Sequence, residues 1–109
     1  MNNEFKLIVL FKDYIESFNK YLVNYPNKDI IRNRIININL DILELIYLTN
    51  LLDDRKDNQV IILSKINMLN YYLEVSLKNK YLSIKVFNNL SNKLEVITKM
   101  IYGWIKYEC

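Results

Sequence analysis

The chain has 109 residues, 51% of them hydrophobic and 25% charged, which predicts one globular domain over residues 1–109 and excludes a disordered chain. It holds one Gly and one Pro, too few for the turns that an all-β sandwich or barrel needs about every ten residues. The net charge of +3 is uneven, since residues 1–54 contribute −2 (six Lys/Arg, eight Asp/Glu) and residues 55–109 contribute +5 (nine against four). This asymmetry suggests an anionic partner for the C-terminal half.

The first predicted helix runs from about Asn3 to Asn24. Its apolar residues recur in steps of three and four, which indicates one buried face; they are Ile8, Phe11, Ile15, Phe18 and Leu22. Tyr25-Pro26 ends the helix, because proline keeps its predecessor out of helical geometry. Pro26 then suits the first position of the next helix, where its missing N–H costs nothing, and Asp29 in that first turn suits the helix dipole.

The second predicted helix extends from Pro26 to about Leu52 and is apolar on two faces. One face holds Ile31, Ile35, Ile38, Ile42, Leu45 and Leu52, with Thr49 at its one polar position. The other face, the helix-two stripe, holds Ile36, Leu40, Leu43 and Tyr47. Because one face of each helix in a four-helix bundle meets solvent, the stripe predicts a self-association surface. The alternative is that the codon bias of an AT-rich genome places Ile and Leu on a tolerant surface.

Two further helices complete the chain. The polar residues 53–58 are predicted to form a loop, and a third helix follows from about Gln59 to Lys78. Its apolar face holds Ile62, Ile66, Leu69 and Leu73. After a connection at residues 79–82, Ser83 is expected to cap the fourth helix, with Leu82 and Phe87 as a hydrophobic staple.

The fourth helix carries the most regular apolar pattern, between Phe87 and Lys106. Its seam holds Phe87, Leu90, Leu94, Ile97, Ile101 and Trp104. Gly103 costs about 1 kcal/mol in a helix relative to Ala, so it marks either a close backbone contact beside Trp104, the expected largest core anchor, or a frayed last turn. Short links between long helices favour antiparallel neighbours. The predicted fold is therefore an all-α, antiparallel up-down-up-down four-helix bundle.

The chain lacks the residues from which most catalytic sites are built. It has no His and a single Cys, Cys109, so the most common general base and transition-metal ligand is absent and no intrachain disulfide can form. One Gly cannot supply a phosphate-binding loop or a nucleophile elbow. Asp41 and Glu44 share a helix face, but surface ion pairs are favoured because no second carboxylate pair completes a metal shell. We expect a protein without enzymatic activity, cofactor or metal.

The N-terminal sequence does not have the basic start and long apolar core of a signal peptide. The longest uninterrupted apolar run, residues 7–11, is too short to cross a bilayer. We therefore expect a soluble, cytoplasmic protein that does not enter a membrane.

Nine basic residues are candidates for contact with an anionic partner. They are Lys28, Arg32 and Arg34 near the start of the second helix, Lys78 and Lys80 around the last connection, and Lys85, Lys93, Lys99 and Lys106 on the fourth helix. Lys85, Lys99 and Lys106 fall on one heptad stripe opposite the apolar seam. Such a stripe is also typical of an ordinary solvated face. In an oligomer, however, the stripe is repeated in every copy, and the positive fields of the copies add to attract phosphate more strongly.

Three segments carry a resemblance to a known family. They are Tyr25-Pro26, the Leu-Asp-Ile-Leu-Glu of residues 40–44, and the Lys-Met-Ile-Tyr-Gly-Trp-Ile-Lys of residues 99–106, which is the most specific. With the helix order and lengths of nearly the whole chain, they resemble the accessory variability determinant proteins of diversity-generating retroelements. That family lies within a broader group of four-helix bundles that includes products of ribosomal RNA intervening sequences.

The resemblance implies a small barrel-like homo-oligomer, commonly a pentamer, that binds the element's reverse transcriptase and structured template RNA. Such proteins support error-prone cDNA synthesis without catalytic activity of their own. On this interpretation the helix-two stripe builds the ring and the nine basic residues contact RNA or polymerase. The alternative is a helical protein–protein adaptor or structural bundle without nucleic-acid contact, and a carboxylate-metal enzyme is a distant third.

Overall fold

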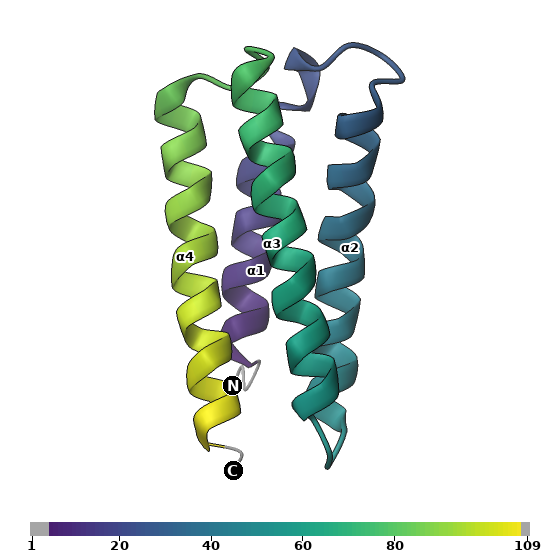
Figure 1. Cartoon of the computed structure of the whole chain (residues 1–109), viewed down its shortest axis with the longest axis vertical. Coiled ribbons are helices and arrows are strands. Elements are labelled where there is room, and N and C mark those ends of the chain that lie inside the picture. Colours follow the sequence, from purple (N-terminus) through teal and green to yellow (C-terminus); the bar gives the residue numbers. More distant parts are fainter. Residues whose placement is uncertain (1–4, 108–109) are drawn as a thin grey trace.

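The computed structural model describes residues 5–107. Its elements are α1 (Lys6–Asn19), the short 3₁₀ helix η1 (Leu22–Asn24), α2 (Ile30–Leu51), α3 (Lys56–Lys78) and α4 (Ile84–Tyr107), with no strand among the described residues. Consecutive long helices run antiparallel, and α4 packs against both α3 and α1 (Figure 1). The predicted all-α four-helix bundle is confirmed. Within residues 5–107 no helix is both long and apolar enough to span a membrane.

The core faces of α3 and α4 are the predicted ones, except that Phe87 and Trp104 at the two ends of the α4 seam are only half-buried. The other side chains of these faces are at most 1% exposed and comprise Ile62, Ile66, Leu69 and Leu73 in α3 and Leu90, Leu94, Ile97 and Ile101 in α4. Along both seams, the steps between these positions alternate between three and four residues. Each helix therefore has one buried face, and the seam identifies it.

The core faces of α1 and α2 are rotated from the predicted ones. The fully buried residues now include Leu7 and Tyr14 in α1 and Ile46 and Asn39 in α2, whereas the predicted Ile15, Leu22, Ile31, Ile38, Leu45 and Leu52 are only half-buried. Ile8, Phe11, Phe18, Ile35, Ile42 and Thr49 are buried as predicted. Apolar residues occupy more than one face of both helices, so the spacing alone does not select the face that enters the core.

Polar side chains explain where the helices begin and end. Asp29 is the N-cap of α2, its Oδ1 accepting a hydrogen bond from the Arg32 N–H at 3.0 Å. The predicted start at Pro26 is therefore wrong, and the predicted continuous helix to Asn24 is wrong because α1 ends at Asn19. The predicted start at Asn3 lies outside the described residues. In α4 the predicted N-cap is confirmed, since Ser83 Oγ accepts from the Val86 N–H at 3.2 Å.

The predicted loop at 53–58 is shorter than expected, because α3 already begins at Lys56. Arg55 closes the preceding helix: its Nε donates to the Leu52 carbonyl at 2.7 Å and a guanidinium nitrogen donates to the Asn50 carbonyl at 3.1 Å. These bonds satisfy carbonyl groups near the end of α2 that have no helical partner. A basic side chain at a helix C-terminus also suits the helix dipole.

Gly103 and Trp104 have different surroundings from those predicted. A Cβ at Gly103 would meet no atom within 4 Å, so the described chain has no close backbone contact there. The residue is not in a frayed turn either, since α4 continues to Tyr107. Trp104 is half-buried and meets the Phe5 ring edge-on at 5.1 Å between centroids. The largest fully buried side chain is Tyr14, so the prediction of Trp104 as the largest core anchor is wrong.

Candidate nucleic-acid interface

Hydrogen-bonded aromatic residues tie the α1–α2 and α3–α4 connections together. The buried Tyr25 donates from its hydroxyl to Ser76 Oγ at 2.6 Å, and Ser76 Oγ donates to the Tyr72 carbonyl at 2.9 Å. The Tyr81 ring lies 4.8 Å from the Tyr25 ring, and its hydroxyl donates to Asp29 Oδ2 at 3.1 Å. Two loops about fifty residues apart in sequence are thus held at one end of the bundle, opposite the α2–α3 connection (Figure 1).

These contacts perturb both tyrosines. Burial raises the pKa of Tyr25 to about 12, although the hydrogen bond with Ser76 works in the opposite direction. The pKa of Tyr81 is also raised, by desolvation and by the carboxylate of Asp29 to which it donates. Both phenols are therefore neutral hydrogen-bond donors at physiological pH.

This end of the bundle, which we call the basic end, concentrates cationic side chains. Residues 20–32 and 74–85 contain six of them, Lys20, Lys28, Arg32, Lys78, Lys80 and Lys85, against the two acids Asp29 and Glu74. Within residues 5–107 none of the six forms an ion pair. One of the two acids, Asp29, is already engaged with the Arg32 N–H and the Tyr81 hydroxyl. The field of this end is therefore positive and available to an anionic partner.

Two lysines of the basic end have left-handed backbones. Lys28 has φ 63° and Lys80 has φ 65°, and they are the two described non-glycine residues with positive φ. This conformation costs a residue with a side chain roughly 1 kcal/mol, so it persists only where the surroundings enforce it. Lys28 precedes the N-cap Asp29, and Lys80 precedes Tyr81. Lys80 ends α3 in a left-handed cap, in which its own N–H donates to the Leu77 carbonyl and the Tyr81 N–H donates to the Ser76 carbonyl. The hydrogen bond between Asp29 and Tyr81 then links the two turns that carry these exposed lysines.

A groove between α1 and α4 opens beside this end. Its charged lining consists of Lys20, Lys85 and Lys93 against Asp13, and Tyr21, Ser17 and Asn89 complete its polar surface. Lys93 Nζ lies 2.6 Å from Asp13 Oδ2, so its charge is largely neutralised across the two helices. Lys20 and Lys85 remain without an ion-pair partner among the described residues. The groove therefore offers two free cations for an anionic ligand.

The nine predicted basic residues do not form one surface. Lys28, Arg32, Lys78, Lys80 and Lys85 meet at the basic end, and Arg34 lines a separate groove between α2 and α3. Lys99 is paired with Glu95 at 3.4 Å on its own helix. Lys106 lies about 30 Å from Lys85 along α4, at the 1.5 Å rise of an α-helix. The heptad stripe of lysines is thus not a continuous binding surface.

Sequence reasoning missed Lys20 and Tyr21, which the fold adds to the basic end. They lie in the half of the chain whose net charge is negative, and no local pattern singles them out. Their signal is spatial, because both line the α1–α4 groove together with Lys85. Asp41 and Glu44 lie in α2, where Asp41 lines the groove between α2 and α3. The described residues contain no cluster of acids, His or Cys suited to a metal ion.

The helix-two stripe is partly exposed in the single chain. Leu40 is 55% and Tyr47 41% exposed, whereas Ile36 and Leu43 are half-buried and Leu43 packs against the core. The Tyr47 ring lies 5.6 Å from Lys12 Nζ, a cation–π distance. An apolar groove between α1 and α2 borders the stripe at Ile36 and Leu40. Self-association through this surface stays a prediction.

No protein-family model and no curated protein sequence matches the chain. One solved structure is similar, that of a protein of unknown function from the S23 ribosomal protein family of Bacteroides thetaiotaomicron VPI-5482. The superposition has a TM-score of 0.79 and 20% sequence identity, and it covers 92% of this chain and 98% of the other. At this identity the similarity shows a shared fold, that of a small helical bundle.

Proposed function

We propose that this protein is a non-catalytic accessory protein of a diversity-generating retroelement. In this role it forms a homo-oligomer that binds the reverse transcriptase and template RNA during mutagenic cDNA synthesis. The proposal is supported by the resemblance at residues 40–44 and 99–106 and by the four-helix fold that the resemblance implies. The observation that carries RNA binding is the basic end, where six cations face two acids and form no ion pair within residues 5–107.

The basic end suits a phosphate backbone better than a single small anion. Its lysines are spread over two connections and the start of α4, so they match several phosphates along a strand. The tyrosine contacts between the connections hold the two loops in place before RNA arrives. Less conformational entropy is then lost on binding.

The helix-two stripe supports assembly of copies into a ring, for which the family resemblance implies a pentamer. Leu40 and Tyr47 supply exposed apolar area, and burying it against another copy is favourable. A ring would repeat the basic end in every copy and so raise the total attraction for RNA. The modest net charge of one chain is then no obstacle to RNA binding.

The test first asks whether a reverse-transcriptase gene and a short repeat pair lie next to this gene, and then reconstitutes the protein with that polymerase and its template RNA. We expect the three components to coelute and cDNA yield to depend on this protein. Light scattering on the protein alone is expected to give a mass several times that of one chain. A polymerase whose cDNA synthesis is unchanged by the protein, together with a monomer that retains no RNA, would contradict the proposal.

A protein–protein adaptor without nucleic-acid contact is the second candidate. The exposed apolar residues of the helix-two stripe favour it, because they suit a protein partner irrespective of the basic end. The adaptor role is the better description if the oligomer forms but no RNA is retained in a salt-dependent manner.

A further inference from the structure

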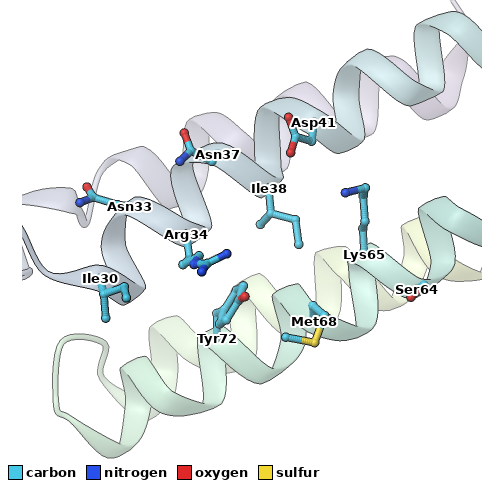
Figure 2. Close-up of a pocket in the computed structure, with 10 residues that line it drawn as sticks. All are labelled: Ile30, Asn33, Arg34, Asn37, Ile38, Asp41, Ser64, Lys65, Met68 and Tyr72. Atoms are coloured by element: carbon cyan, nitrogen blue, oxygen red, sulfur yellow. The ribbon is translucent and has the colours of Figure 1, made fainter.

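A groove between α2 and α3, separate from the basic end, places cations beside an aromatic ring and apolar side chains. It has a volume of about 480 Å³ and is open to solvent. Figure 2 shows Arg34 of α2 and Tyr72 of α3 pointing toward one another across it, with Lys65 of α3 pointing toward α2 farther along. Ile38 and Met68 give the groove an apolar surface between these polar groups. A half-buried aromatic ring thus faces one cation across the groove and shares its wall with a second cation farther along.

The cations of this groove are free to bind. Neither Arg34 nor Lys65 forms an ion pair or a hydrogen bond with another described side chain. One acid, Asp41, lines the groove, near Lys65 (Figure 2). Asn33, Asn37 and Ser64 add amide and hydroxyl groups, which pair with base edges.

We infer that the α2–α3 groove is a binding site for unpaired nucleotides of RNA, with a base on Tyr72 and the flanking phosphates near Arg34 and Lys65. The inference rests on the proposed RNA-binding function and adds a site away from the lysine-rich connections. Aromatic rings hold single-stranded RNA by stacking, and cations beside the ring follow its backbone. The groove walls are helices, so the backbone positions of Tyr72, Arg34 and Lys65 are fixed relative to one another.

The arrangement favours a single strand over a duplex. The bases of A-form RNA are stacked on one another, so a protein ring reaches their faces only in loops, bulges and ends. The Tyr72 ring is half-buried between two helices, where a splayed base fits and an intact helix does not. The basic end thus binds the phosphate backbone through charge, and the α2–α3 groove binds unpaired bases through stacking.

The test compares Tyr72 with its neighbour Tyr71, a matched control that is 54% exposed and does not line the groove. Tyr72→Leu, Tyr72→Phe and Tyr71→Leu are titrated with fluorescent oligoadenylate, oligouridylate and a blunt RNA duplex of equal length. Circular dichroism checks that each variant is folded. Single strands containing 4-thiouridine are also photocrosslinked to the wild-type protein, and the attachment site is mapped by mass spectrometry.

We expect Tyr72→Leu to weaken single-strand binding about 5- to 150-fold, the range for loss of one stacked base, with duplex binding changed less than about 2-fold. Tyr72→Phe keeps the ring and is expected to restore binding, Tyr71→Leu to bind normally, and the crosslink to map to Tyr72 or Met68. Arg34→Gln should lower the slope of log K against log salt by about 0.7, the value for one phosphate contact with a single strand.

Each result bears on one proposal. Equal binding by Tyr72→Leu and Tyr71→Leu, with a crosslink elsewhere, would overturn the groove assignment while leaving RNA binding at the basic end intact. If the wild-type protein binds none of the three RNAs, the proposed function fails first, and the groove assignment fails with it.

Discussion

Neutralising the basic end tests whether position or total charge controls RNA binding. The triple substitution Lys78→Gln, Lys80→Gln and Lys85→Gln removes three exposed cations that have no ion-pair partner among the described residues, so no carboxylate is left unpaired. Each lost phosphate contact lowers the slope of log K against log salt by about 0.7 to 0.9. For three contacts the slope falls by about 2 to 3, and affinity at 0.15 M salt falls about 50- to 150-fold.

The matched control is Lys56→Gln, Lys99→Gln and Lys106→Gln, which takes the net charge from +3 to 0 just as the first triple does. Lys99 is paired with Glu95, and Lys56 and Lys106 lie away from the basic end. Anisotropy titrations of an RNA hairpin with a single-stranded tail, repeated over a range of salt, measure both slopes. Thermal unfolding checks that the variants are folded, since Gln is close to Lys in helix propensity. Equal losses in the two triples would refute a localised site and leave only a diffuse charge effect.

Three further predictions concern stability and assembly. Gly103→Ala is expected to raise the free energy of unfolding by about 0.5 to 1 kcal/mol in urea titrations, because the new Cβ meets no neighbour; a loss of stability would reveal a contact with another copy. Tyr25→Phe should cost about 1 kcal/mol at neutral pH, since it removes the hydrogen bond to Ser76. The pKa of Tyr25 is raised from 10.0 to about 12, so the stability that this shift contributes is present below pH 10 and is lost as the pH rises toward 12. Between pH 10 and pH 12 the melting temperature of the Phe variant should therefore fall less steeply than that of the wild-type protein. Leu40→Glu should convert an oligomer to monomers in light scattering, whereas Val60→Glu, equally exposed on α3, should not; assembly unaffected by the Leu40 change rules out the stripe as the interface.

The fold was predictable wherever the sequence allows only one helix face to be buried or only one residue to cap a helix. Seams such as Leu90–Leu94–Ile97 have a single helical face that can be buried, and Ser83 has the spacing of an N-cap. The choice of face in α2 was not predictable in the same way, because Ile and Leu lie on two sides. Packing against α1 and α3 selects the face that includes Asn39 and Ile46. That selection depends on neighbouring helices, which local spacing does not describe.

The candidate site was predictable only as a set of residues. Whether a lysine is free depends on acids elsewhere in the chain: Lys93 is paired with Asp13, eighty positions away, while Lys85 on the same helix is not. The charge count of each half of the chain also gave no sign of Lys20, because the N-terminal half is negative overall. In the structure Lys20 lines the α1–α4 groove together with Lys85.

The tyrosine contacts give the cationic site its position in the fold. Tyr25 and Tyr81 join two connections that a bundle would otherwise leave as independent mobile loops. Both phenols are protonated and donate hydrogen bonds at physiological pH, and desolvation raises their pKa values further above that range. Exposed lysines on a loop that is already ordered lose less entropy on binding than lysines on a free loop. A small bundle with a net charge of +3 can therefore present a locally strong site for RNA, because rigidity and local placement compensate for the low total charge.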